Sequence, residues 1–306
     1  MVGCGFIGSR LASALVAEGI PTTVLTRTAP PSDIALALAL AGARLLTGNA
    51  TDRFLLQGAL EGVDHVVYAA GSLFPGASAL LTRASSSELS PLLSLLDSLR
   101  RNSRPTLTFI SSGGAVYGMP ERLPVDEAHP TNPISSYGII KLAGERHVLA
   151  YSRHYGFGVR VLRVSNVYGP GQRPDRGQGV VASFLNGVLT GVDCPLYGDG
   201  SVVRDFIHID DLMAAIVDLL RTPQVPLLLN IGSGVGVSLK SLAAVVEEVT
   251  GSRLNLSPRP ARPVDVPRIV LDVTLLRRTI DHDVVDLATG IGLTWRAMRG
   301  SFRAAV

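Results

Sequence analysis

A tyrosine and a lysine stand four positions apart in the segment SSYGIIKLAGE, residues 135–145. The spacing of apolar residues predicts a helix here, so Tyr137 and Lys141 lie on one face of it. A lysine ammonium near a phenol favours the phenolate and lowers its pKa, which makes the tyrosine a usable base near neutral pH. The same spacing also occurs in ordinary exposed helices, so the chemistry depends on the other motifs.

Two hydroxyl side chains end an apolar segment just before this helix. The segment TLTFISS, residues 106–112, is typical of a buried strand, and Ser111 and Ser112 close it. Gly113 and Gly114 follow, where a further hydroxyl would be sought next to a catalytic tyrosine. Either the site has lost its proton donor, or a neighbouring serine supplies it.

Glycines open the chain in the pattern Gly3-x-Gly5-x-x-Gly8, which leads into a predicted helix. They allow a tight turn, a close approach of the backbone to a pyrophosphate, and close packing of the helix on a strand. The helix N-terminus adds free N–H groups and positive dipole for the phosphates. With the strand at residues 22–27 after the helix, the motif predicts a dinucleotide site.

The end of that strand carries Thr26 and Arg27 and no carboxylate. An NAD site usually has an acidic residue there, which bonds the ribose hydroxyls, whereas a guanidinium suits a 2′-phosphate. Arg27 therefore favours NADP over NAD. The alternative is an arginine in a solvated loop with no role in binding.

The first half of the chain alternates strand-like and helical segments, which predicts a Rossmann-type doubly wound parallel α/β sheet covered on both faces. The segment at residues 34–46 is read as one buried helix, too short to cross a bilayer. The predicted strands are 22–27, 64–71, 106–112 and 159–165, and the helices between them are 9–19, 34–46, 87–101 and 137–156.

The alternation breaks after residue 166, where Gly- and Pro-rich loops appear. A helix near 180–190, a strand and helix at 206–220 and a strand at 227–231 follow, and then a helix near 241–251 and a short final helix. We expect a smaller C-terminal domain interleaved with the first: residues 1–165 with about 205–235 bind the dinucleotide, and about 166–204 with 236–306 bind the substrate.

Composition excludes several classes. Of 306 residues, 46% are hydrophobic and 17% charged, which is typical of a compact globular protein. The net charge is only +3 and its basic residues are scattered, so no nucleic-acid surface is expected. Cys4 and Cys194 form neither a disulfide framework nor a metal cluster. With no membrane span and no export signal at the start, a cytoplasmic protein is predicted.

The first strand is short. A central parallel strand should precede Gly3, and only Met1 and Val2 are available for it, whereas strands usually have about five residues. We therefore expect the natural chain to begin several residues upstream.

The sequence resembles the extended short-chain dehydrogenase/reductase family, in its NAD(P)-dependent nucleotide-sugar epimerase/dehydratase branch, which is that of UDP-glucose 4-epimerase. The resemblance covers essentially the whole chain and is specific for the family more than for the reaction. Its carriers are GCGFIGS, VVYAAG, SSGGAVYG, YGIIK, RVSNVYGPGQ, LYGDGSVVRDFIHIDDL, NIGSG and RPVDVP.

By this resemblance Tyr137 is the base, Lys141 its partner and a ligand of the nicotinamide ribose, and the second domain binds a nucleotide-diphosphate sugar. The residues expected at the cofactor are Gly3, Gly5, Phe6, Ile7, Gly8, Thr26, Arg27, Ala69, Ala70, Gly71, Ser111, Tyr137 and Lys141. Five residues are expected at the substrate. Ser112 and Asn166 approach the sugar nucleotide, Arg204 and Arg262 bind its diphosphate, and Asp265 contacts its ribose. The bare chemistry agrees for the arginines, whose guanidinium groups suit phosphates, although Arg204 could instead form a structural pair with a local aspartate.

The family's catalytic Ser or Thr would fall on Gly113, which has no side chain. Ser112 is the nearest hydroxyl and is expected to take the role, with Ser111 in reserve. Dehydratases of the family place an Asp-Glu pair at the next two positions, where this chain has Gly114 and Ala115. Without those acid/base groups, elimination of water is not expected.

The resemblance implies a nucleotide-diphosphate-sugar 4-epimerase, which works through a transient 4-keto sugar with hydride transfer to and from a bound NAD or NADP. The alternative is an NADPH-dependent 4-ketoreductase of a nucleotide-bound 4-keto-6-deoxysugar, which Arg27 favours. A non-catalytic NAD(P)-binding regulator is a third possibility, against which the Tyr137–Lys141 pair argues. Relatives dimerise through two helices per subunit, so a homodimer through residues 87–101 and 137–155 is expected. No metal is expected.

Overall fold

The computed structural model describes residues 1–71, 81–101, 105–174 and 179–305. Its main sheet is parallel and runs in the order β2 (Arg44–Thr47), β1 (Thr23–Thr26), β3 (His65–Tyr68), β4 (Thr106–Ser112), β5 (Val159–Val164) and β9 (Leu228–Ile231), with Val2 bridging β1 and β3. Val2 takes the central place because it pairs in parallel with both Leu25 and Tyr68. The strand order reverses at this point, which is where such sheets bind ligands.

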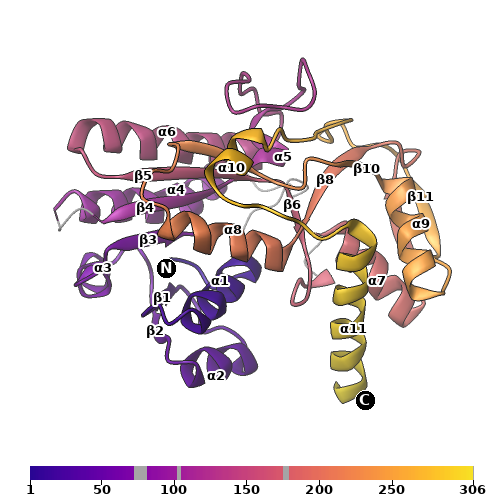
Figure 1. Ribbon diagram of the computed structural model, residues 1–306, viewed down its shortest axis with the longest axis horizontal. Helices are drawn as coiled ribbons and strands as arrows, with labels where there is room; N and C mark the ends of the chain where they lie inside the picture. The colour runs from indigo at the N-terminus through magenta and orange to yellow at the C-terminus, as the bar shows by residue number, and fades with distance from the viewer. Residues whose placement is uncertain (72–80, 102–104, 175–178, 306) are drawn as a thin grey trace.

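Helices cover both faces of the sheet (Figure 1). On one face α3 (Arg53–Leu60), α4 (Leu81–Leu99) and α6 (Ser136–Tyr155) enclose a core that contains Leu92, Leu95 and Phe109. On the other, α1 (Phe6–Ala17) packs beside α8 (Ile209–Arg221) around Leu11 and Ile216. The predicted doubly wound fold is therefore confirmed.

A second set of elements gathers at the far end of the molecule (Figure 1). The strands β7 (Cys194–Tyr197) and β11 (Leu256–Arg259) pair in parallel, while β8 (Val203–His208) lies between β6 (Asn166–Tyr168) and β10 (Gly236–Ser238). With α7 (Val180–Thr190), α9 (Leu239–Thr250) and α11 (Leu287–Ala305) they enclose a core of their own around Phe184 and Leu242. The expected domain boundaries stay a prediction. Residues of α10 (Thr274–Thr279) and of the segment before it pack in the first core.

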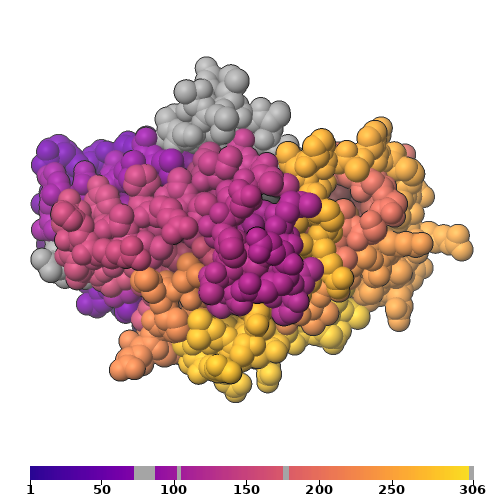
Figure 2. Space-filling view, turned by 90° about the horizontal axis from the view of Figure 1, so that it is seen from above, coloured from indigo at the N-terminus to yellow at the C-terminus, as the bar shows by residue number. Residues whose placement is uncertain are grey.

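A strap formed by residues 266–273 ties the two parts together. Leu271 bridges Val125, Arg268 bridges Val203, and the backbone N–H of Leu271 donates to the buried Asp205 carboxylate at 3.3 Å. Figure 2 shows the early part of the chain at one end, the orange and yellow C-terminal part at the other, and the purple loop after β4 between them. The end of β4 therefore lies where the two parts meet.

Two expectations about the elements were wrong. Residues 34–46 are not one buried helix: α2 (Ser32–Leu40) ends, Gly42 turns the chain with a φ of 93°, and β2 begins. The helix lies on the surface, with Leu40 80% exposed. The final helix is long rather than short, with 19 residues in α11.

Candidate active site

The glycine-rich turn is packed against the end of β3. Gly3 has a φ of 103°, and a Cβ added to it would lie 2.7 Å from the backbone of Ala70. A Cβ at Gly8 would lie 2.2 Å from the carbonyl oxygen of Gly3. These two glycines are required because helix α1 and the two chain segments approach too closely for any side chain.

Gly5 differs from its neighbours, because a Cβ there would meet nothing within 4 Å. It is the N-cap of α1, makes no side-chain cap, and no acidic residue occupies the first turn. Phe6 and Ile7 pack their side chains against the first core, which leaves the helix N-terminus open on the Gly5 side. This open turn, with free N–H groups and positive helix dipole, fits the pyrophosphate of a dinucleotide.

The end of β1 carries the two residues expected to select the cofactor. Thr26 is buried, and its hydroxyl donates to the carbonyl of Thr28 at 2.9 Å. Arg27 is exposed beside it. The side chain that could meet a ribose or its phosphate at this position is therefore Arg27.

Tyr137, Lys141 and Ser112 meet at the end of β4. Helix α6 begins there because its N-cap Ser135 accepts a hydrogen bond from the N–H of Gly138 at 3.1 Å. The Lys141 ammonium donates to the carbonyl of Ile110 at 3.1 Å and lies 5.9 Å from the centre of the Tyr137 ring. The Ser112 hydroxyl lies close enough to the Tyr137 phenol to donate a hydrogen bond to its ionised form.

The pKa of Tyr137 is raised, chiefly because the phenol is removed from water. The hydrogen bond with Ser112 opposes this rise, and the carboxylate of Glu88 adds to it. Burial lowers the pKa of Lys141, which Glu88 and Glu145 oppose. Lys141 is not among the causes that shift the pKa of Tyr137, so the expected lowering of the tyrosine pKa by the lysine stays a prediction.

Ser111 faces the opposite way from Ser112. Its buried hydroxyl donates to Glu145, which also forms a buried ion pair of 2.7 Å with Arg163. The serine held in reserve is therefore engaged in the core. At Gly113 a Cβ would lie 2.6 Å from Leu271, so a side chain there would meet the strap. Of the three positions, only Ser112 has its hydroxyl at Tyr137.

Ala69, Ala70 and Gly71 follow β3 and lie between the glycine turn and Lys141. A Cβ at Gly71 would lie 3.6 Å from the lysine nitrogen and 3.3 Å from a carboxylate oxygen of Glu88. On the other side of the site, a Cβ at Gly114 would lie 3.2 Å from the side-chain oxygen of Asn166. The Asn166 amide thus faces the glycines after β4.

Arg204, Arg262 and Asp265 form a second group. Arg262 donates to both carboxylate oxygens of Asp265, at 2.8 and 3.0 Å, and its guanidinium lies 4.2 Å from the centre of the Tyr197 ring. Arg204 donates to the carbonyls of Val203 and Val266, at 2.9 and 2.6 Å. Burial lowers the pKa of Arg204, while Asp265 raises it and Arg262 lowers it further. Arg204, Arg262 and Asp265 were expected in one group, and they lie in one group in the structure. Tyr197, which also belongs to it, was not predicted from the sequence.

Glu88 and Glu145 were also missed. Nothing local distinguishes either glutamate from a solvated helix residue, since both act through contacts far away in the sequence. Among the described residues no group of three His, Cys, Asp or Glu side chains could hold a metal ion. Within the same residues, no helix has both the length and the hydropathy to cross a bilayer.

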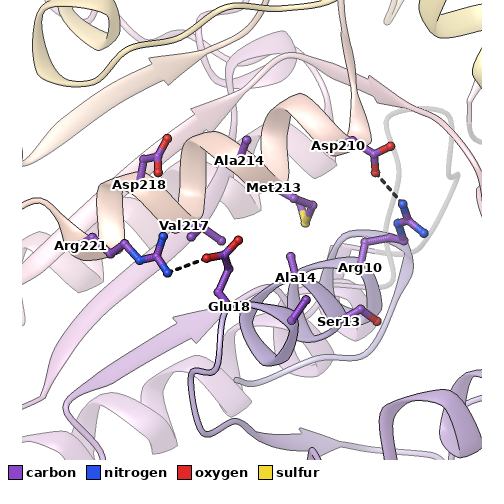
Figure 3. Close-up of a pocket in the computed structure, with 11 residues that line it drawn as sticks. Arg10, Ser13, Ala14, Glu18, Asp210, Met213, Ala214, Val217, Asp218 and Arg221 are labelled. Carbon is purple, nitrogen blue, oxygen red and sulfur yellow. Dashed lines mark hydrogen bonds and ion pairs between the residues drawn. The ribbon is translucent and has the colours of Figure 1, made fainter. Parts of the chain in front are cut away.

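A cavity of about 450 Å³ lies elsewhere, between α1 and α8 (Figure 3). Its floor is apolar, with Ala14 and Met213, and an ion pair closes each end: Arg10 with Asp210 at 2.5 Å, and Arg221 with Glu18 at 2.7 Å. It is lined by none of the residues expected at the cofactor or the substrate.

Two curated relatives show the range of the chain's similarities. A putative UDP-glucose 4-epimerase of Methanocaldococcus jannaschii is 36% identical over 199 residues, which is 65% of this chain and 65% of that protein's length. A dTDP-4-dehydro-6-deoxy-D-allose reductase of Streptomyces bikiniensis is 31% identical over 315 residues, covering 96% of this chain and 94% of the relative.

Solved structures agree over almost the full length. The UDP-glucose 4-epimerase of Thermotoga maritima, solved with UDP-glucose, superposes with a TM-score of 0.90 at 29% identity and covers 98% of both chains. That of Thermus thermophilus, solved with NAD, gives a TM-score of 0.85 at 30% identity, again with 98% of both chains. Residues 2–232 match the profile of a single family. With its open dinucleotide turn and its Tyr137–Lys141 pair, the chain belongs to the NAD dependent epimerase/dehydratase family.

Proposed function

We propose that this chain is a nucleotide-diphosphate-sugar 4-epimerase that works through a transient 4-keto sugar. The observation that carries the proposal is the placement of the Ser112 hydroxyl at Tyr137 beside Lys141, next to an open dinucleotide turn. The relatives named as UDP-glucose 4-epimerases support the reaction, and the similar structure solved with UDP-glucose supports the substrate class.

Tyr137 takes the proton from the 4-hydroxyl of the sugar, and returns it when the opposite epimer forms. Ser112 donates to the tyrosine or sugar oxygen, and so holds both in line. A nicotinamide ring, when bound, supplies the exchange of hydride with the sugar carbon. Gly114 and Ala115 offer no acid or base, so these two positions supply no group for proton transfer at a second carbon.

We propose that Arg204 and Arg262 bind the diphosphate, with Asp265 at the nucleoside ribose and Asn166 near the sugar. Arg262 already spans Asp265 and Tyr197. A guanidinium in this position can stack on a base or move to a phosphate without leaving its partners. Binding energy from the contacts of Arg204 and Arg262 with the diphosphate would hold the keto sugar in the site while it rotates to present its other face.

The test is conversion of UDP-glucose, and in parallel of dTDP-glucose, by the purified chain supplied with NAD. The product expected is the 4-epimer, identified by chromatography and nuclear magnetic resonance. The control is Tyr137→Phe, which keeps the ring and removes the proton acceptor. A chain that converts neither sugar would contradict the assignment and favour the non-catalytic regulator. A variant as active as the parent would show that Tyr137 is not the base.

A 4-ketoreductase is the second candidate, since Arg27 suits a 2′-phosphate and the Streptomyces bikiniensis relative is named as a reductase. The similar structure of the Thermus thermophilus enzyme was solved with NAD. Mass spectrometry of the dinucleotide released on denaturation separates the two: NAD carried through purification supports the epimerase. An empty chain that prefers NADPH over NADH in titration supports the reductase.

We also propose that the chain forms a homodimer. Helices α4 and α6 pack side by side on one face of the sheet, where two copies could form a four-helix bundle. Light scattering of the purified chain decides between one copy and two. A cytoplasmic location stays a prediction from the sequence.

A further inference from the structure

A glutamate faces the catalytic pair from a helix that the proposed reaction does not use. Glu88 lies on α4, one turn before Pro91, and its backbone carbonyl accepts a hydrogen bond of 3.4 Å from the Tyr68 hydroxyl. Its carboxylate oxygen lies 3.3 Å, and the Lys141 nitrogen 3.6 Å, from the place that a Cβ of Gly71 would take. Three elements thus bring a carboxylate and an ammonium to the two sides of one glycine.

This meeting point lies at the carboxyl ends of the central strands. Gly71 follows β3, and Lys141 donates to Ile110 near the end of β4. Ligands of doubly wound sheets bind in the crevice outside these ends. The small pocket at this place is lined by Tyr68, Ala70, Glu88, Leu89, Leu92, Phe109, Tyr137, Ile140, Lys141 and Gly144.

Glu145 is the second carboxylate that acts on the charge of Lys141. Glu145, on the same helix, holds Arg163 of β5 through two donor nitrogens and also accepts from Ser111. Glu88 raises the pKa of Lys141 ahead of Glu145, although burial has the larger, opposite effect. It also raises the pKa of Tyr137, in the same direction as burial. The uncharged groups that face the pair are Ser112 of β4 and Tyr68 of β3.

We propose that Glu88 is a positioning residue that acts through Lys141 and Tyr137: its carboxylate balances the lysine charge, so that the crevice favours the cationic oxidised nicotinamide ring over the neutral reduced one. The inference rests on the proposed function, because it assumes that this crevice takes a nicotinamide dinucleotide. It assigns to this carboxylate the task of keeping the cofactor in the form that starts the reaction.

Two consequences follow from Coulomb's law. Removing one negative charge from a crevice that takes the nicotinamide ring should lower the preference for the oxidised over the reduced form by about 3- to 10-fold. The same removal makes the tyrosine and the lysine easier to deprotonate. The pH profile of turnover should therefore move to lower pH by about half a unit to one unit on both limbs.

The experiment measures dissociation constants for NAD and NADH, and for NADP and NADPH, by calorimetry. It compares the parent with Glu88→Gln, which removes the charge, and Glu88→Asp, which keeps it. Glu248→Gln on the exposed face of α9 is the control for loss of a surface carboxylate. The pH profile of each variant is measured with the sugar on which the parent is active.

The proposal expects the affinity ratio to fall in Glu88→Gln alone, together with a shifted pH profile. An unchanged ratio in Glu88→Gln, or an equal fall in Glu88→Asp, would overturn it, since the second result indicates a packing role. A parent chain that binds dinucleotides but converts no sugar would refute the proposed function while the ratio still decides the role of Glu88. A parent that binds no dinucleotide would overturn both.

Discussion

Replacing Ser112 with alanine should slow turnover without unfolding the chain. The hydroxyl is only partly buried and lies where it can donate to the ionised Tyr137, which must lose its proton to act as a base. A hydrogen bond to a charged group contributes about 1.5 to 3 kcal/mol. Its loss therefore raises the pKa of Tyr137 further.

The sign of this effect can be read from the pH dependence. Burial already raises the pKa of Tyr137, so at neutral pH only a small fraction is ionised in the chain alone. A higher pKa lowers that fraction by about 10- to 100-fold at neutral pH. The deficit should shrink as the pH rises towards the tyrosine pKa, because both proteins then approach full ionisation.

Ser111→Ala is the matched control, since the two serines are neighbours on β4 with opposite partners. Ser111 is buried and bonds Glu145, so its loss should cost about 1 to 3 kcal/mol in the free energy of unfolding and leave kcat unchanged. The assay is kcat for the sugar interconversion from acid to alkaline pH, with urea unfolding of each variant. Full turnover in Ser112→Ala, or a slow but equally stable Ser111→Ala, would refute the assignment of the hydroxyl.

Three further changes test the site and its support. Gly8→Ala forces a Cβ to 2.2 Å from the Gly3 carbonyl and should lower the free energy of unfolding by about 2 kcal/mol or more in urea titration, whereas Gly5→Ala, with open space around it, should keep its stability and bind dinucleotide more weakly. Glu145→Gln leaves Arg163 buried without its charge partner and should cost about 3 to 5 kcal/mol; a loss comparable to that of a surface pair would show that the pair is hydrated. If Arg27 binds the 2′-phosphate, Arg27→Ala should weaken NADPH binding by about 10-fold and leave the affinity for NADH unchanged. Equal changes in both affinities would contradict the predicted preference for NADP.

Local spacing predicted the parts of the site that lie within one element or turn. Gly3, Gly5 and Gly8 are read from the backbone that a strand, turn and helix require, and Tyr137 and Lys141 from one face of one helix. The alternation of strand side chains likewise separates Ser111 from Ser112 once the buried partner Glu145 is known. The glycine turn and the tyrosine–lysine pair need no knowledge of distant segments, whereas the separation of the two serines does.

The features that sequence reasoning missed depend on distant contacts. Glu88 reaches the site because α4 packs beside α6 on one face of the sheet, and Leu271 covers Gly113 from a distant part of the chain. Residues 34–46 were misread because an apolar run fits a helix or a strand equally well, and Gly42 was not taken as the break. The burial that raises the pKa of Tyr137 cannot be read from the spacing of a motif.

The strap at residues 266–273 also bears on how the chain assembles. It contributes Leu271 at Gly113 and bridges to Val125 and Val203, yet it lies near the end of the sequence. Contacts of such long sequence separation form late in folding, because loop closure must precede them. During synthesis the loop that follows β4 therefore stays exposed to solvent until the strap, and so almost the whole chain, has left the ribosome. A fragment that ends before the strap would keep its glycine turn and its tyrosine but lack one wall of the active site.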